Sequence, residues 1–234
     1  MSSPFTITRE GAVAVLTHDD GKANTFVQAT FEELRRTLEE IDKSDASAVL
    51  YRGRPGYFSA GLNLKALPAL SRPQFVALLE QFGQAVLDLF LFPKPVVAEV
   101  TGHAIGAGSM FVFAADVRYF NAGAWKFGLN EVPNGMPVPS YGVEVARAAL
   151  RAGDQLELIC HGRMINPEQA LELQLAAAIT EDSHSIALER ARTLAELPSG
   201  VYAITKRNLR GAAAESVSTR LYAEAERFVS ALGR

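Results

Sequence analysis

Apolar residues in the first 165 positions recur at two spacings, one typical of strands and one typical of amphipathic helices. The strand pattern predicts a hairpin over 5–17 and short strands at 48–51, 96–100, 117–120 and 125–127. The helical pattern predicts helices at 26–41, 75–89 and 110–115, and Pro93 and Pro95 end the second of them. A glycine-rich turn is expected at 102–108. Strands that alternate with helices predict an α/β domain.

Beyond about residue 165 the pattern becomes purely helical. Asn166, Pro167 and Gln169 form a helix start with a capping side chain, and further helices are predicted at 184–197, 199–209 and 215–232. Lys206, Arg207 and Arg210 are expected on a solvated face of one of these helices. With no linker or repeat between them, residues 1–165 are predicted to form the core and residues 166–234 a helical region.

Composition narrows the class of protein without naming it. The 234 residues are 48% hydrophobic and 21% charged, which is ordinary for a globular chain and excludes disorder. With a net charge of -3 the chain has no excess of basic residues for binding nucleic acid. The single cysteine excludes a set of internal disulfides. No apolar run is long enough for a membrane span and the N-terminus does not resemble a signal peptide, so a cytoplasmic protein is expected. The scattered histidines predict no metal site.

Residues 101–108 (TGHAIGAG) are the first segment that could carry chemistry. A strand, glycines and a helix start present backbone N–H groups to negative charge. The segment also matches the glycine turn of short-chain dehydrogenases, and Tyr202 and Lys206 supply their Tyr-x-x-x-Lys pair. However, a dinucleotide fingerprint should open the first βαβ unit, and here 100 residues precede it. A dehydrogenase is therefore disfavoured.

Two further segments could carry chemistry, one through its small residues and the other through a lone acid. Residues 57–64 (YFSAGLNL) have side chains small enough for a ligand to approach the backbone, although a tight turn explains them equally well. In residues 127–137 (FGLNEVPNGMP), Glu131 stands among apolar residues, glycines and prolines. Such surroundings raise the pKa of a carboxyl group toward the range useful for proton transfer, whereas a surface loop would leave it unchanged.

Together these segments resemble the crotonase (enoyl-CoA hydratase/isomerase) superfamily. The resemblance rests on residues 58–64 (FSAGLNL), 94–104 (KPVVAEVTGHA) and 127–131 (FGLNE). It implies a spiral of ββα units over residues 1–165, followed by a helical region, 166–234, that covers the pocket and is used in assembly as a homotrimer or a dimer of trimers. It also implies acyl-CoA thioester substrates of fatty acid metabolism, with no permanently bound cofactor.

The resemblance also assigns site residues. Two backbone N–H groups, of Ala60 and Ala107, are expected to hold the thioester oxygen and stabilise an enolate. Glu131 is the expected acid/base. The implied binding set for substrate and coenzyme A is Lys22, Asn24, Ala60, Gly61, Leu62, Asn63, Leu64, Gly106, Met110 and Met136.

One departure from the family bears on the reaction. Hydratases of the family use two carboxylates to activate water, and the second position falls at Met110, whose thioether cannot transfer a proton. The Gly-Leu-Asn-Glu run around Glu131 is most similar to Δ3,Δ2-enoyl-CoA isomerases, which use one glutamate. A hydratase or another crotonase-type lyase, and a non-catalytic acyl-CoA-binding subunit, are the alternatives. Glu99, a charge within an apolar strand, is expected to have a structural partner rather than a catalytic role.

Overall fold

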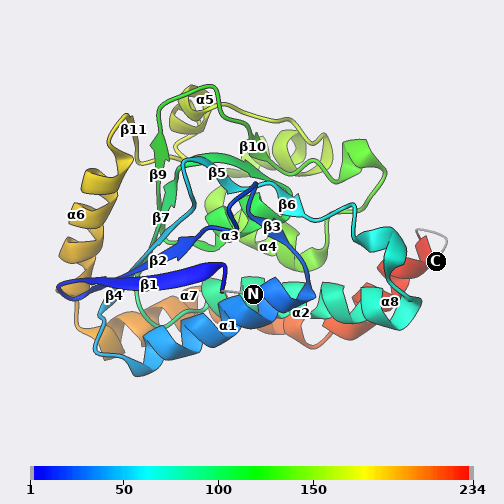
Figure 1. Ribbon diagram of the computed structural model, residues 1–234, viewed down its shortest axis with the longest axis horizontal. Coiled ribbons are helices and arrows are strands. Elements are labelled where there is room, and N and C mark those ends of the chain that lie inside the picture. Colours follow the sequence, from blue (N-terminus) through cyan, green and yellow to red (C-terminus); the bar gives the residue numbers. More distant parts are fainter. Residues whose placement is uncertain (1–2, 232–234) are drawn as a thin grey trace.

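Four successive strand–strand–helix turns make up most of the protein, whose residues 3–231 are described by a computed structural model (Figure 1). The first turn contains β1 (Phe5–Glu10), β2 (Val13–His18), β3 (Thr25–Phe26) and α1 (Gln28–Lys43). The second contains β4 (Ala48–Arg52), β5 (Gly56–Ser59), β6 (Gly61–Leu62), a 3-10 turn (Leu67–Ala69) and α2 (Arg72–Phe90). The third contains β7 (Val96–Val100), β8 (Gly102–Ile105) and α3 (Ala107–Ala114). The fourth contains β9 (Val117–Asn121), β10 (Phe127–Gly128), a 3-10 turn (Val132–Asn134) and α4 (Ser140–Ala149).

The rest of the chain is mostly helical. It contains a 3-10 turn (Ala152–Asp154), a π-helical turn (Leu156–Cys160), α5 (Pro167–Glu172), β11 (Ala178–Thr180), α6 (Ser183–Ala195), α7 (Ser199–Ser218) and α8 (Leu221–Ala231). The predicted cap of α5 is confirmed: the Gln169 N–H donates to the Asn166 side chain at 2.9 Å, and the Asn166 N–H donates back to the Gln169 side chain at 3.1 Å. This reciprocal pair satisfies two donors that a helix start leaves free.

Three sheets connect the turns. The largest has the order β1-β2-β4-β7-β9-β11, with β1 antiparallel to β2 and every other pair parallel. A second sheet has the order β10-β8-β5, and β3 pairs with β6 in a third, all parallel. Because β5 lies directly beside β8, the segment after β5 and the segment after β8 lie next to each other. These are the two glycine-containing segments singled out in the sequence.

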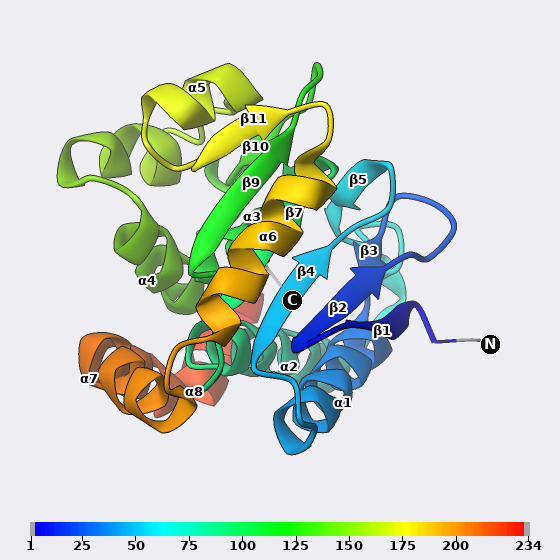
Figure 2. The ribbon, with the colours of Figure 1, turned by 90° about the vertical axis from the view of Figure 1, so that its left-hand side faces the viewer.

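Both faces of the large sheet are covered. α6 packs across one face, as Figure 2 shows, and its Ala187, Leu188 and Ala191 pack against strand side chains such as Val15 and Leu50. The other face meets the main core, to which α1, α2 and α3 contribute. α3 is buried along its whole length, which matches its apolar sequence and explains the absence of a polar face.

Several expected elements differ from the observed ones. Residues 102–105 form β8 rather than part of a turn, because they pair with β5; a Cβ atom at Gly102 would lie 2.0 Å from the Gly56 carbonyl carbon. The tail is not purely helical, since β11 joins the large sheet beside β9. α7 continues through 210–214, where a break was expected. The short strands β3, β5 and β6 and helix α4 were not predicted, because two to four residues carry no readable periodicity and α4 begins after a proline-rich segment.

Candidate active site

The β5–β6 connection and the start of α3 meet at very short range. Gly61 has a φ of +88°, and a Cβ atom at this position would lie 2.6 Å from the Ile105 carbonyl oxygen and 3.4 Å from the Ala107 nitrogen. Only glycine combines this backbone conformation with so close an approach. Gly61 therefore brings the backbone of β6 against the first turn of α3.

The expectation that the Ala60 N–H holds a substrate oxygen is wrong. That N–H donates to the Ala23 carbonyl oxygen at 2.9 Å, so it belongs to the contact between the β5–β6 connection and the loop before β3. The error arose because the sequence shows which residues are small but not which way each peptide group points. Ala60 still lines the cavity described below.

The N–H of Leu62 is the better donor on this strand. The next N–H, of Asn63, donates to the Phe26 carbonyl oxygen in β3 at 2.9 Å. Because successive N–H groups of a strand point to opposite edges, the N–H of Leu62 points away from β3. The N–H of Ala107 belongs to the first turn of α3, where N–H groups have no partner within the helix. Leu62 and Ala107 line one cavity, so two peptide donors can converge on one oxygen there.

Glu131 lies opposite these donors, directly after the β10 segment. Its side chain is 9% exposed, and Oε2 has no hydrogen-bond partner among the described residues. A Cβ atom at Gly106 would lie 3.2 Å from Glu131 Oε1, which places the carboxylate beside the N-terminus of α3. Burial raises the pKa of Glu131 to about 7, outweighing backbone hydrogen bonds that lower it. A carboxyl group tuned to this range can both accept and return a proton near neutral pH.

A cavity of about 70 Å³ connects Glu131 with the peptide donors. It is lined by Ala60, Gly61, Leu62, Leu64, Leu79, Phe82, Gly106, Ala107, Met110, Asn130, Glu131, Asn134, Met136, Pro139, Tyr141 and Phe228. Most of these side chains are apolar, and Glu131 is the single carboxylate among the lining residues. The arrangement provides one proton-transfer group facing a low-polarity space with donors for a developing anion.

Met110 occupies the α3 position that faces this space. Its side chain is fully buried, and its terminal atoms approach the Gly142 position closely. A thioether neither gives nor takes a proton and holds water weakly. Among the described residues lining the cavity, no second acid or base stands opposite Glu131.

Three predicted binding residues lie outside the cavity lining. Asn24 is fully buried and donates to the carbonyl oxygens of His18, Tyr57 and Phe58 at 2.6, 3.2 and 3.2 Å, so it cannot reach a nucleotide. Lys22 is exposed on the neighbouring loop, and a role in binding phosphate stays a prediction for it. Asn63 continues the β6 pairing and also lies outside the cavity lining.

Two charged groups outside the site are structural. Glu99 is 2% exposed and contacts Arg52 at 2.9 Å and His184 Nδ1 at 2.9 Å, which confirms the expected structural partner. Lys206 and Arg210, expected on a solvated face, instead contact Asp116 at 2.8 Å each, and the Asp116 side chain is only 11% exposed. The ion pairs with Asp116 therefore hold these two charged side chains against the core, which the polar sequence of the helix does not indicate.

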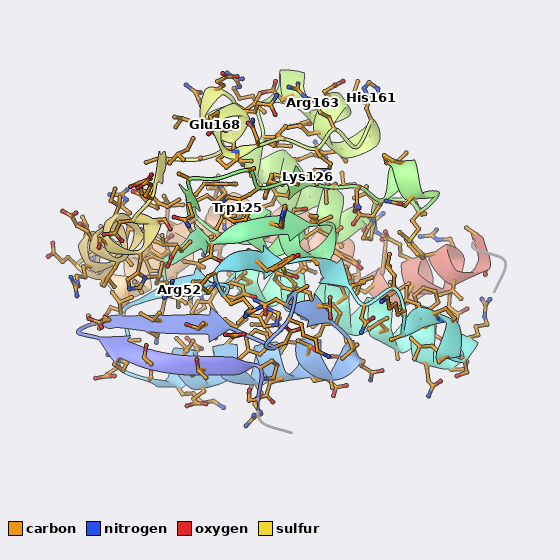
Figure 3. The ribbon with its side chains drawn as sticks, turned by 45° about the horizontal axis from the view of Figure 1, so that its top comes forward. Arg52, Trp125, Lys126, His161, Arg163 and Glu168 are labelled. Carbon is orange, nitrogen blue, oxygen red and sulfur yellow. The ribbon has the colours of Figure 1, made fainter. Side chains whose placement is uncertain are left out.

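His103 in β8 is turned away from the cavity. Its ring meets Trp125 in an edge-to-face contact with the ring centroids 5.5 Å apart, and its Nδ1 accepts the Lys126 N–H at 3.0 Å. Figure 3 places Trp125 and Lys126 along the segment before β10, on the outer side of the smaller sheet. This histidine therefore belongs to a surface aromatic group.

The sequence did not reveal the far wall of the cavity. Leu79 and Phe82 appeared only as members of a core stripe, Tyr141 lies on the unpredicted α4, and Phe228 lies on a helix 97 positions from Glu131. The helical region 166–234 was expected to cover the pocket, but the sequence did not show that Phe228 would be the residue lining it.

Other features of the surface offer less chemistry. A groove of about 930 Å³ between α1, α2 and α7 is larger, but none of the residues that line the Glu131 cavity lies in it. Within residues 3–231, no group of three histidine, cysteine, aspartate or glutamate side chains is placed to hold a metal ion. No helix in the described range is both long and apolar enough to cross a bilayer.

The ββα spiral and the buried carboxylate of Glu131 beside the start of α3 agree with the family that the sequence resembles. The chain belongs to the enoyl-CoA hydratase/isomerase family, whose model matches residues 8–233. A probable enoyl-CoA hydratase from Bacillus subtilis is 31% identical over 187 residues, 78% of this chain and 71% of that protein.

Solved structures agree in fold along nearly the whole chain. An enoyl-CoA hydratase/isomerase family protein from Pseudomonas syringae has a TM-score of 0.90 at 25% identity, covering 96% of this chain and 98% of that one. A Mycobacterium tuberculosis protein, described in one solved structure as an enoyl-CoA isomerase and in another as a probable enoyl-CoA hydratase, has a TM-score of 0.87 at 29% identity in both. The first of these structures covers 99% of both chains. The expected α/β crotonase fold is thereby confirmed.

Proposed function

We propose that this protein is an enoyl-CoA isomerase that moves the double bond of a 3-enoyl-CoA thioester into conjugation at C2. The observation that carries the proposal is the presence of one carboxylate, Glu131, in a cavity where the position of a second acid is occupied by Met110. The similar M. tuberculosis protein is described under both an isomerase and a hydratase name, so it supports a reaction of this family without favouring either one.

The proton moves between two carbon atoms through one group. The Glu131 carboxylate removes a proton from C2, and the electrons of the C–H bond form the enolate of the thioester. When the C3–C4 double bond shifts to C2–C3, Glu131 returns the proton to C4. The raised pKa makes both transfers feasible, because the carboxylate is basic enough to accept the proton and the acid is strong enough to release it.

The negative charge formed in this step lies on the thioester oxygen. The N–H groups of Leu62 and Ala107 are the proposed donors to that oxygen, and the α3 N-terminus adds a favourable dipole. One such donor is worth about 3–4 kcal/mol of transition-state stabilisation in comparable sites. The apolar walls reduce competition from water for the enolate and the proton.

The direct test is the isomerisation of 3-hexenoyl-CoA, followed by the ultraviolet absorbance of the conjugated product. Glu131→Gln should lower kcat/KM by about 10²–10⁴-fold, the usual contribution of a general base. Glu168→Gln is the matched control, since Glu168, labelled in Figure 3, is exposed on α5 and does not line the cavity. Absence of turnover by the unaltered protein, or equal turnover by Glu131→Gln, would refute the proposal.

Hydration of 2-enoyl-CoA is the second candidate, favoured by the name of the B. subtilis relative. It requires a group other than residue 110 to position water, and the described lining residues offer only the amides of Asn130 and Asn134 beside Glu131. Crotonyl-CoA hydration that outpaces isomerisation would establish it. Binding of acyl-CoA without either reaction would instead indicate a non-catalytic subunit.

A further inference from the structure

The active-site cavity is closed at one end by the C-terminal helix α8. Its other end is open, since Leu64 is 55% exposed and Asn134 is also exposed. At the closed end lie Leu79, Tyr141 and Phe228, which are 5%, 3% and 9% exposed. A substrate that enters beside Leu64 therefore points its acyl tail toward α8.

A second, smaller cavity of about 10 Å³ lies behind this closed end. It is lined by Leu79, Pro139, Tyr141, Leu221, Glu224, Ala225 and Phe228, four of which also line the first cavity. Leu79, Pro139, Tyr141 and Phe228 thus form a partition between the two spaces, called here the acyl wall. Phe228 is its one member from α8.

The acyl wall is firmly supported. Glu224 of α8 accepts hydrogen bonds from both the N–H and the hydroxyl of Ser140 at the start of α4. Arg72 of α2 contacts Glu226 at 2.6 Å and Ser230 at 2.8 Å. These contacts tie α8 to the two helices that carry the rest of the wall. Displacing Phe228 would require breaking charge-assisted contacts at both ends of its helix.

The space in front of the wall is small. The cavity has a volume of about 70 Å³, and part of it must receive the reacting carbons. A tightly packed apolar wall resists insertion of further methylenes, because overpacking forces side chains out of their preferred rotamers. Long acyl tails therefore have no room unless the wall yields.

We propose that Phe228 sets the acyl length and restricts this protein to short-chain acyl-CoA thioesters. The proposal rests on the proposed function for the position of the reacting carbons. Removal of the Phe228 side chain would join the two cavities across the wall, giving a longer tail a path along α8.

The test compares chain length in two variants. The first measurement is thermal stabilisation by the saturated thioesters hexanoyl-CoA and dodecanoyl-CoA, which requires no catalysis. The second is kcat/KM for isomerisation of 3-hexenoyl-CoA and 3-dodecenoyl-CoA. Leu221→Ala is the matched control for Phe228→Ala, because Leu221 lines only the smaller cavity and its loss leaves the wall in place.

The unaltered protein and Leu221→Ala should favour the six-carbon chain in both measurements. In Phe228→Ala the ratio of six-carbon to twelve-carbon kcat/KM should fall at least about tenfold, the discrimination that a misfitting methylene or two produces. Equal stabilisation by both thioesters in the unaltered protein, or an unchanged ratio in a folded Phe228→Ala, would overturn the proposal. If no 3-enoyl-CoA is isomerised but six-carbon binding is preferred, the proposed reaction fails while the acyl wall stands.

Discussion

At the scale of single residues, burial without a hydrogen-bond partner shifts the pKa values of two titratable side chains. Glu131 and His18 are both buried, and each has a side-chain atom without a hydrogen-bond partner among the described residues. Burial favours the neutral form of each, so it raises the pKa of Glu131 to about 7 and lowers that of His18 to about 4. Glu131 faces the cavity, whereas His18 stacks between Phe5 and Phe26.

The pH dependence of isomerisation should report the raised pKa of Glu131. The base must be ionised, so kcat/KM should rise about tenfold between about pH 6 and pH 8 and level off above that range. Measuring kcat/KM for 3-hexenoyl-CoA across this range gives the apparent pKa of the free enzyme. A profile that is flat above about pH 5.5 would show that Glu131 titrates as an ordinary carboxyl group.

His18 should make the fold sensitive to mild acid. The unfolded chain takes up a proton near pH 6.5, but the folded chain does so only near pH 4, so stability falls as the pH drops between these values. At about pH 5 the loss relative to neutral pH is about 2 kcal/mol. Denaturant unfolding of the protein and of His18→Phe at both pH values measures it. His161→Phe, on an exposed side chain, is the control, and an identical pH dependence in all three proteins would contradict the assignment.

At the scale of elements, the site depends on how short segments are tied together. Asn24 joins the loop after β2 to β5, since its amide donates to two carbonyl oxygens of β5 as well as to that of His18 at the end of β2. It adopts a φ of +52° that few side chains tolerate. The sequence indicated this loop but assigned Asn24 to ligand binding, because a polar residue in a loop does not reveal its hydrogen-bond partners. The same limit explains why Ala60 was chosen in place of Leu62.

Asn24→Ala should destabilise the protein by about 2–4 kcal/mol, because it leaves buried carbonyl oxygens without donors. Lys22→Ala, two positions away on the exposed side of the loop, should change stability by less than about 0.5 kcal/mol. Denaturant unfolding of both variants measures the contrast. Equal effects would show that the amide of Asn24 is not a structural link.

α7 is anchored to the core by a buried charge cluster. Lys206, whose side chain is 5% exposed, and Arg210 both hold Asp116, and burial lowers the pKa of Lys206 to about 8. Lys206→Ala should cost about 3 kcal/mol, since it leaves part of a buried charge uncompensated. Arg207→Ala, on the exposed side of the same helix, is the control and should cost less than about 0.5 kcal/mol. A small loss in Lys206→Ala would mean that Arg210 and the Val96 N–H satisfy Asp116 without Lys206.

At the scale of the whole molecule, the long helices and strands and the family motifs could be predicted from the sequence. The contacts that close the cavity could not. The strand at 96–100 and the helix predicted at 75–89, observed as Arg72–Phe90, follow from periodicity and proline stops. Residues 127–131 indicated the acid before its burial was known. The acyl wall joins α2, α4 and α8, which are far apart in sequence, so no local pattern contained it.

The ratio of isomerisation to hydration tests the central claim most directly. Purified protein is given 3-hexenoyl-CoA and crotonyl-CoA in parallel, and kcat/KM is measured for loss of each substrate. With one proton-transfer group in the cavity, isomerisation should exceed hydration by at least about 10²-fold, the contribution of a missing acid or base. Hydration equal to or faster than isomerisation would contradict the account, since it would require a second group to activate water.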